Sequence, residues 1–298
     1  MAPISSNLRG IILMVAASGA FVVNDSLFKL GSQGLPVFQA IAMRGVMAMV
    51  WCLPLLVYTR TLARLPMVID RWALLRNGFE ILTVFCFLSA LTRMPIADIT
   101  AIGQLSPVFV LIGAAVIFRE ALGRVQIGLI LAAFFGALLV AQPTGEAFSP
   151  FAILGVFAAI GMAGRDLAAR KLPAEMPGPV VTYGALLMVM LAAGLVSLIF
   201  EEWTTPTGRS LAFLAGSGFF LMFGQLFIYL TYRIAATNVV APFFFTGSLW
   251  AVVLGASIFG EIPGPVAIIG IVLVAGSGAV LVMRTRRAAR IRAAMETK

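Results

Sequence analysis

The chain has no histidine and only two cysteines among its 298 residues. The absence of histidine excludes Ser-His proteases, His-based proton relays and His-containing metal sites. Cys52 and Cys86 lie inside apolar stretches, so we interpret them as small packing residues and not as a redox pair. The sequence also lacks a G-x-x-x-x-G-K-[ST] motif, which excludes an ATP-driven pump within this chain. We therefore expect no enzyme, no catalytic residues, no metal site and no cofactor.

Charged residues are scarce as well. They make up 11% of the chain, whereas 61% is hydrophobic and the mean hydropathy is +1.05. Soluble domains contain about 25% charged residues. The net charge is still +9, but the basic residues are scattered at the ends of apolar stretches, which argues against nucleic acid as a partner. This composition predicts an all-α polytopic membrane protein that has the lipid bilayer as its surroundings.

Ten hydrophobic stretches are each long enough to cross a bilayer core of about 30 Å, which requires about 20 apolar residues. Breaks containing Pro and Gly separate most of them. We predict transmembrane spans at residues 10–30, 36–57, 72–92, 96–118, 125–142, 149–169, 178–200, 210–232, 237–259 and 264–283. The spans and their short loops leave no room for a soluble catalytic or regulatory domain.

The second half of the chain repeats the first. Residues 93–140 and 233–282 both begin with Arg, contain Phe-x-Glu and end in Gly-Ala-x-Leu-Val. Because each half has five spans, an odd number, the second half must be inverted relative to the first. Inverted repeats are typical of alternating-access carriers that bind substrate near the midplane between the halves. We expect five-helix repeats at 1–143 and 148–283, followed by a basic cytoplasmic tail at 284–298.

The distribution of Lys and Arg predicts the orientation. Three basic residues lie in one set of loops, namely Lys29, Arg93 and Arg209. The opposite set of loops and the tail contain seventeen: Arg9, Arg60, Arg64, Arg71, Arg76, Arg119, Arg124, Arg165, Arg170, Lys171, Arg233, Arg284, Arg286, Arg287, Arg290, Arg292 and Lys298. Because cytoplasmic loops are enriched in Lys and Arg, we expect both termini in the cytoplasm of a bacterium and the chain in its inner membrane.

Two glycine-rich triplets resemble nucleophile loops. They are Gly216-Ser217-Gly218 and Gly276-Ser277-Gly278. The chain offers no histidine as a base, so we predict that both are small-residue faces that let helices approach closely.

The repeated segments resemble a known family. The pattern Ala97–Ala101, Leu105–Phe109, Phe118–Glu120, Gln126–Gly128 and Gly136 resembles the EamA-type repeat of the drug/metabolite transporter superfamily. The second half matches through Ala241, Leu249-Trp250, Phe259–Glu261, Gly270 and Gly276. The resemblance implies a ten-helix bundle around a central cavity, lined mainly by the first four helices of each half. The fifth and tenth helices would be peripheral.

The resemblance also implies a carrier of small metabolites. Members of this superfamily export amino acids, including aromatic ones, and we expect this chain to be similar to them. Other members import solutes, so the alternative is an uptake carrier for a nucleoside-like, vitamin-like or cationic solute. An intramembrane enzyme is disfavoured by the missing histidine. We expect a monomer or weak homodimer.

Two ionisable residues lie deep inside predicted spans and have apolar counterparts in the other half. Arg44 is about 12 Å from the predicted outer surface at ~1.5 Å per residue, and Glu80 is similarly deep from the inner one. Arg can bind a carboxylate with its planar fork, and Glu can accept from an ammonium group. Two interpretations are open: Arg44 binds substrate, or it forms a structural ion pair with Asp25 or Glu80. Uncharged side chains that would need a partner if buried are further cavity candidates: Asn77, Gln104, Tyr183, Gln225, Tyr229 and Trp250.

Aligning the two halves pairs polar residues near the span ends. The predicted outer gate consists of Asp25, Lys29, Arg93 and Asp98. The predicted inner gate consists of Asp166, Arg170, Arg233 and Asn238. The alternative is that these side chains only fix the depth of the helices at the membrane interface.

Overall fold

The computed structural model describes residues 6–106, 108–109, 112–113, 116, 124–141, 150–169, 171–234, 243 and 246–296, and the regular secondary structure of these residues is helical. Across these residues there is no β-strand. The helices are α1 (Ser6–Gly31), α2 (Val37–Tyr58), α3 (Arg71–Leu91), α4 (Ile96–Gly103), α6 (Arg124–Ala141), α7 (Phe151–Ala169), α8 (Gly178–Phe200), α9 (Gly208–Ile234), α11 (Thr246–Leu254) and α12 (Pro265–Glu296). A 3-10 helix, η1 (Leu62–Ile69), precedes α3, and a π-helical turn, η3 (Gly255–Phe259), follows α11.

The helices have the length and composition of membrane spans. Six of them, namely α1, α2, α3, α7, α8 and α9, are long and apolar enough to cross a bilayer, and two shorter apolar helices cover Thr246–Phe259 and Pro265–Ser277. The expected all-α polytopic architecture is therefore confirmed at this level. Each predicted span overlaps a described helix, although the start of the ninth, from residue 237, lies outside the described residues. The count of ten crossings stays a prediction.

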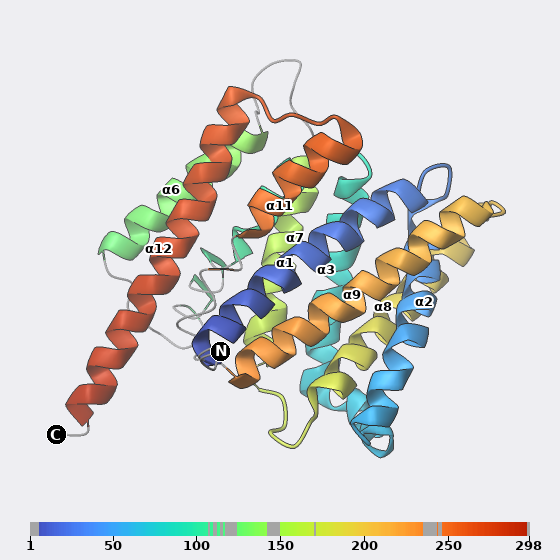
Figure 1. Cartoon of the computed structure of the whole chain (residues 1–298), viewed down its shortest axis with the longest axis horizontal. Coiled ribbons are helices and arrows are strands. Elements are labelled where there is room, and N and C mark those ends of the chain that lie inside the picture. Colours follow the sequence, from blue (N-terminus) through green and yellow to red (C-terminus); the bar gives the residue numbers. More distant parts are fainter. Residues whose placement is uncertain are drawn as a thin grey trace, which may run out of the picture.

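Helices of the two halves pack in matching pairs (Figure 1). Helix α1 packs along α9 as α7 packs along α3, and α1 contacts α11 as α7 contacts α4. Two further pairs, α2 with α8 and α6 with α12, each join a helix to its counterpart in the other half. Exchanging every helix for its counterpart therefore leaves these pairings unchanged.

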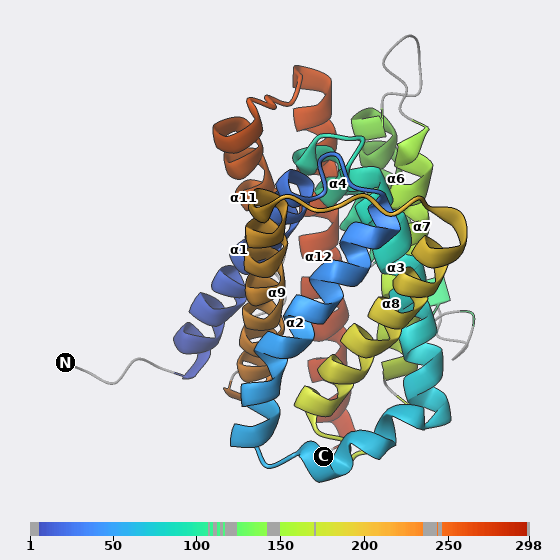
Figure 2. The same ribbon diagram turned by 90° about the vertical axis from the view of Figure 1, so that its right-hand side faces the viewer.

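The two termini lie toward the same end of the bundle (Figures 1 and 2). We call this the terminal end, and we call the opposite end, which carries the connections at 32–36, 201–207 and 260–264, the distal end. Helix α12 continues to Glu296, so most of the basic tail extends the last helix beyond the span that the sequence predicts.

Small residues let some helices approach closely. A Cβ atom on Gly161 of α7 would lie 2.5 Å from Thr83 Oγ1 of α3, and one on Gly218 of α9 would lie 2.8 Å from the backbone nitrogen of Ala48 in α2. The predicted small-residue face is thus confirmed at Gly218. It is wrong at Gly276, where a Cβ atom would meet open space.

Candidate functional site

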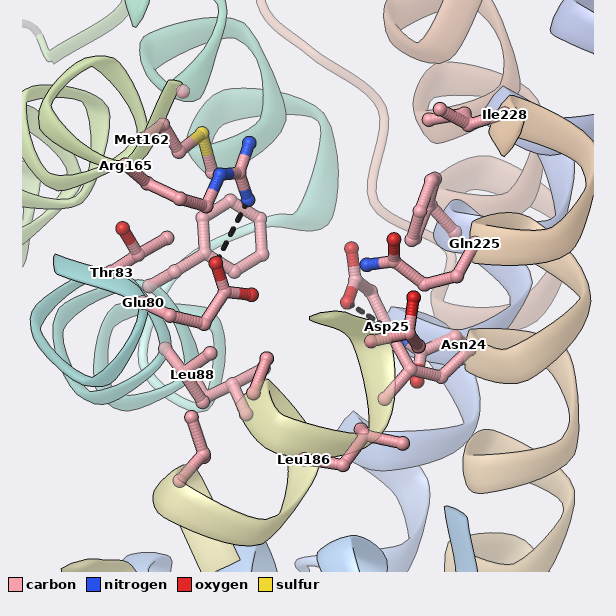
Figure 3. A pocket seen from close by; sticks show the side chains of 18 of the residues that line it. Asn24, Asp25, Glu80, Thr83, Leu88, Met162, Arg165, Leu186, Gln225 and Ile228 are labelled. Atoms are coloured by element: carbon pink, nitrogen blue, oxygen red, sulfur yellow. Dashed lines mark hydrogen bonds and ion pairs between the residues drawn. The ribbon is translucent and has the colours of Figure 1, made fainter. Parts of the chain in front are cut away.

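A cavity of about 360 Å³ lies inside the bundle (Figure 3). Side chains of both halves line it, from α1, α2, α3, α4, α7, α8, α9 and α11. Among the described residues, α6 and α12 contribute none. The cavity implied by the family resemblance, with peripheral fifth and tenth helices, is confirmed to this extent.

Acidic and basic side chains line the cavity in equal number. They are Asp25, Arg44, Arg76, Glu80, Arg165 and Asp166. Apolar side chains complete the wall, including Phe21, Phe87, Leu186 and Ile228. A charged group is costly inside a membrane unless it faces a partner or a cavity, and this arrangement supplies both.

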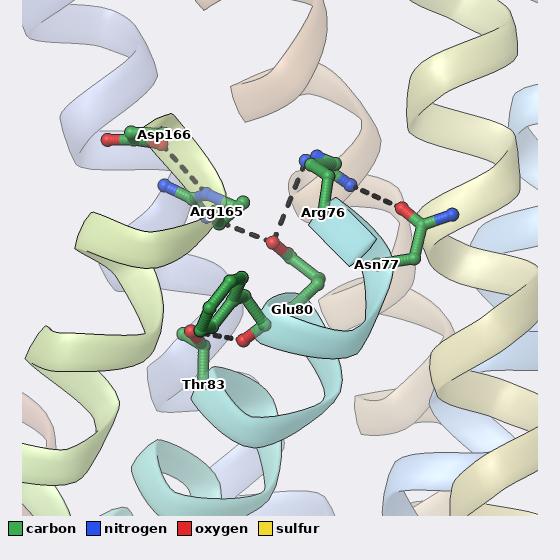
Figure 4. A network of polar contacts seen from close by, with 7 residues as sticks. Arg76, Asn77, Glu80, Thr83, Arg165 and Asp166 are labelled. Carbon is green, nitrogen blue, oxygen red and sulfur yellow. Dashed lines mark hydrogen bonds and ion pairs between the residues drawn. The ribbon is translucent and has the colours of Figure 1, made fainter. Parts of the chain in front are cut away.

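One wall of the cavity carries a set of matched charges, which we call the Glu80 cluster (Arg76, Asn77, Glu80, Arg165 and Asp166; Figure 4). Glu80 Oε2 lies 3.1 Å from Arg165 Nη1 and 3.6 Å from Arg76 Nη2. Arg165 Nε lies 2.9 Å from Asp166 Oδ1, and Arg76 Nη1 donates to Asn77 Oδ1 at 3.0 Å. The carboxylate of Glu80 is therefore held between two guanidinium groups.

The facing wall is joined by hydrogen bonds to the neutral amide of Asn24. Asn24 Oδ1 accepts from Ser217 Oγ at 2.8 Å and from Arg44 Nη1 at 3.4 Å, and Asn24 Nδ2 donates to Asp25 Oδ1 at 2.8 Å. Arg44 is 5% exposed, and its Nε is buried without a hydrogen-bond partner. The ion pairs of the described residues do not include Arg44 with Asp25 or Glu80. The structural ion pair that the sequence allowed is thus not formed.

The predicted cavity residues divide into two groups. Those that line the cavity are Arg44, Glu80, Gln104 and Gln225. Asn77 instead accepts from Arg76, Tyr183 packs against Leu56 and Val68 near η1, and Trp250 is 39% exposed. These three residues are not among those that line this cavity, because depth within a span does not determine which face of the helix a side chain occupies. The side chain of Tyr229 lies outside the described residues.

The predicted outer gate is only partly assembled. Lys29 Nζ lies 2.6 Å from Glu261 Oε1, and Asp98 is close enough to interact electrostatically with both charges. Asp25 lines the cavity instead, and Arg93 is exposed. The structure therefore does not bring Asp25 and Arg93 together with Lys29 and Asp98, since one helical turn separates Asp25 from the distal contacts.

The predicted inner gate falls mostly outside the described residues. This holds for Arg170, for Asn238 and for the side chain of Arg233. Asp166 is described, and it lines the cavity beside Arg165.

Two carboxylates that we did not predict as site residues connect the halves at the distal end. Glu261 Oε2 accepts from the backbone N–H of Ile96 at 2.9 Å, at the start of α4. The two oxygens of Glu201 accept from the N–H groups of Phe38 and Gln39 at 3.0 and 2.9 Å, at the start of α2. Carboxylates stabilise helix N-termini by satisfying free N–H groups and the helix dipole. Both acids come from the second half and both helices from the first.

The backbone at Gly260 positions one of these acids. Its φ of +66° is a conformation that glycine adopts without steric cost, and the turn follows η3 directly. Lys29 Nζ also donates to the carbonyl of Met94 at 2.7 Å. Helix α1, the start of α4 and the η3–α12 connection are thereby joined. The Phe-Gly-Glu motif was the sequence signal that pointed to Glu261, although the repeat alone did not identify Lys29 as its partner.

Arg76 and Arg165 were both expected in cytoplasmic loops, and that placement is wrong. Each lies inside a helix and lines the cavity. The spacing of Arg76 and Glu80, four residues apart on one helix, is the sequence signal for the first of these contacts. Without these two residues the predicted bias of basic residues is 15 to 3, and its direction is unchanged.

Comparison with known proteins agrees with this architecture. Residues 8–142 match the model of the EamA-like transporter family. The pseudopaline exporter of Pseudomonas aeruginosa is 26% identical over 89% of this chain and 93% of its own. A riboflavin transporter of Vibrio cholerae is 28% identical over 86% and 87%, and an S-adenosylmethionine uptake transporter of Rickettsia prowazekii is 24% identical over 62% of each chain.

The fold is also found among solved structures. One crystal structure, 17% identical, superposes with a TM-score of 0.66 and covers 95% of this chain and 98% of that chain. Together these findings show that the chain is similar to EamA-like transporters and to bacterial transporters of small molecules. The likeness to aromatic amino-acid exporters stays a prediction.

Proposed function

We propose that this protein is a secondary transporter that exports amino acids or similar small metabolites across the bacterial inner membrane by alternating access. The observation that carries this proposal is the cavity between the halves, which has charges of both signs in equal number beside apolar side chains. Such a lining suits a solute that is both dipolar and partly apolar. The relationship to an exporter that covers most of both chains supports the direction of transport.

The proposed architecture is ten spans in two inverted repeats, at 1–143 and 148–283, with the basic tail at 284–298 in the cytoplasm. The packing of the helices, which is unchanged when counterparts are exchanged, supports the repeat. The family model also matches almost the whole of the proposed first repeat. A reporter that is active only in the cytoplasm, fused after Lys298, should be active. A reporter active only in the periplasm, if it worked at this position, would overturn the orientation.

Alternating access requires that the two ends open in turn. The charged residues of the Glu80 cluster lie nearer the terminal end, since Arg76 is in the second turn of α3 and Arg165 is in the last turns of α7, whereas Asp25 and Arg44 lie nearer the distal end. In the proposed orientation the Glu80 cluster therefore lies on the cytoplasmic side of the cavity. Lys29, Asp98 and Glu261 would form the outer gate, which must separate before solute leaves.

The inner gate is proposed at the opposite end, formed by Asp166, Arg170, Arg233 and Asn238. It would close when the distal contacts separate. The proposed functional unit is a monomer or weak homodimer.

The proposal is tested in proteoliposomes by competition against a labelled amino acid. Unlabelled amino acids, nucleosides, riboflavin and quaternary cations are added one at a time. Saturable flux that amino acids inhibit supports the proposal. Flux of another solute that amino acids do not inhibit would overturn the substrate class, and absence of flux for every solute would overturn the transporter.

The alternative function is uptake of a vitamin-like, nucleoside-like or cationic solute. It is favoured by the relatives named as a riboflavin transporter and as an S-adenosylmethionine uptake transporter. Growth of a riboflavin auxotroph, or of a strain that requires external S-adenosylmethionine, would support it. Increased resistance of cells to toxic amino-acid analogues would instead support export.

A further inference from the structure

Two opposite charges on the cavity wall are not used in the ion pairs of the described residues. They are Asp25 on α1 and Arg44 on α2. They influence each other electrostatically without forming a contact pair. All other charged residues that line the cavity belong to the Glu80 cluster.

Asp25 has an available carboxylate oxygen. Its Oδ1 accepts from the neighbouring amide of Asn24 at 2.8 Å, and this is a neutral donor. Figure 3 shows Asp25 and Gln225 across the cavity from Glu80 and Arg165. A buried carboxylate is stabilised by a cationic partner, and no side chain of the described structure supplies one within ion-pair distance.

Arg44 has unused donors. Its one described hydrogen bond is the 3.4 Å contact with Asn24 Oδ1, an atom that already accepts from Ser217. The guanidinium packs over the ring of Phe28, at 5.3 Å from the centroid, and its Nε is buried without a partner. A guanidinium with this many free N–H groups binds a carboxylate through two parallel hydrogen bonds.

The sequence suggested that Glu80, deep inside a span, could accept from a substrate ammonium group, but its contacts make it a poor acceptor for one. Both Arg165 and Arg76 already contact its Oε2. A substrate ammonium group placed there would have to approach two guanidinium groups of the same sign. Electrostatic repulsion therefore moves the ammonium site away from Glu80.

We propose that Asp25 and Arg44 together form the head-group site for a zwitterion, with Asp25 binding the ammonium group and Arg44 the carboxylate. The remainder of the solute lies against the apolar wall formed by Phe21, Phe87 and Leu186. This inference rests on the proposed function and narrows its substrate class to solutes that carry both head groups. It assigns Asp25 to substrate selection and not to the outer gate.

The test removes one head group from the solute and one charge from the protein at a time. Wild-type protein in proteoliposomes carries labelled L-leucine against three competitors: L-leucine, L-leucinamide, which lacks the carboxylate, and N-acetyl-L-leucine, which lacks the ammonium group. In the wild type each analogue should compete at least about tenfold more weakly than leucine, because each leaves one charge-assisted hydrogen bond unmade.

The variants should each erase one preference. Asp25→Asn should abolish the preference over N-acetyl-L-leucine and keep the preference over leucinamide. Arg44→Lys, which cannot form the bidentate fork, should weaken the preference over leucinamide and keep the other. The control is Glu202→Gln, which neutralises an exposed carboxylate that does not line the cavity. It should leave both ratios within about twofold, because surface substitutions away from a site have small effects.

The outcomes separate the two proposals. Leucine transport with the same preferences in Asp25→Asn as in the wild type would overturn the head-group site alone. The same holds if Glu80→Gln, and not Asp25→Asn, abolishes the preference for the ammonium group. If the wild type carries no amino acid, the proposed function fails, and the head-group site fails with it. Should Asp25→Asn not fold, Asp25→Ser removes the same charge, and an unchanged preference over N-acetyl-L-leucine in that variant would also overturn the site.

Discussion

The helix pairs α3–α7 and α1–α9 each join the two halves and are counterparts of one another, yet different chemistry holds them together. In the first pair Arg165 contacts Glu80 at 3.1 Å, and in the second Ser217 donates to Asn24 at 2.8 Å. A buried ion pair requires nearly complete matching of its charges. The charges of Glu80 and Arg165 therefore bind each other and hold α3 and α7 together. The neutral pair makes no such demand, which leaves the neighbouring Asp25 available. Backbone packing thus determines where the cavity lies, and the matching of side chains determines which wall a solute can use.

The largest effect that tests this comparison is expected for Glu80→Ala. Removing the carboxylate leaves Arg76 and Arg165 facing each other without the acid between them, and breaking a buried pair costs about 3–5 kcal/mol. The melting temperature in detergent should fall sharply. Asp25→Ala is the matched variant on the other wall, and it should lower the melting temperature much less. Equal losses would show that Asp25 also holds the structure together.

Helix contact tests the same comparison with uncharged residues. A Cβ atom on Gly161 would meet Thr83 of α3 at 2.5 Å, whereas one on Gly216 would meet the flexible end of Leu27 of α1 at 3.2 Å. We expect Gly161→Ala to destabilise the protein by about 1–3 kcal/mol through overpacking, and Gly216→Ala to cost less. Thermal unfolding of both variants measures this. A larger loss for Gly216→Ala would mean that α1 and α9 are the more tightly constrained pair.

The distal contacts should show a smaller effect on stability and a clearer one on access. Glu261→Gln weakens the contact with Lys29, at an expected cost of about 1 kcal/mol. We expect it also to raise the labelling of a cysteine at position 100, in the cavity, by an impermeant maleimide added outside cells. The background should lack Cys52 and Cys86. Lys29→Met should act in the same direction, and unchanged labelling in both variants would argue that these charges only anchor the helices.

The smallest effect is expected for Arg93→Gln. Arg93 is exposed, so its loss should change stability by about 0.5 kcal/mol or less. Labelling at position 100 should match that of the parent protein. If Arg93→Gln opened the outer end as Glu261→Gln does, the original gate of four residues would be restored. The same measurement on Arg233→Gln tests whether Arg233, the counterpart of Arg93 in the second half, contributes to a gate at the terminal end.

Sequence reasoning located the helices more reliably than the directions of their side chains. The predicted span 178–200 has the same bounds as α8, because a run of apolar residues between Pro-Gly breaks allows little else. Asn77 and Arg76 are neighbours, yet only Arg76 lines the cavity, since one residue turns a helix by about 100°. Likewise Asp25 and Lys29 are one turn apart, and that turn separates the cavity from the distal end.

The sequence by itself determined the class of protein. Its hydrophobic stretches, repeat and scattered charges require helices in a membrane, because backbone groups in lipid must be satisfied within each segment. The tertiary structure alone decided the pairing of charges. Glu80 meets Arg165 across 85 residues of sequence, and Lys29 meets Glu261 across 232. Such contacts depend on which helices become neighbours and which faces they turn to each other, and periodicity within a single helix contains no information on either.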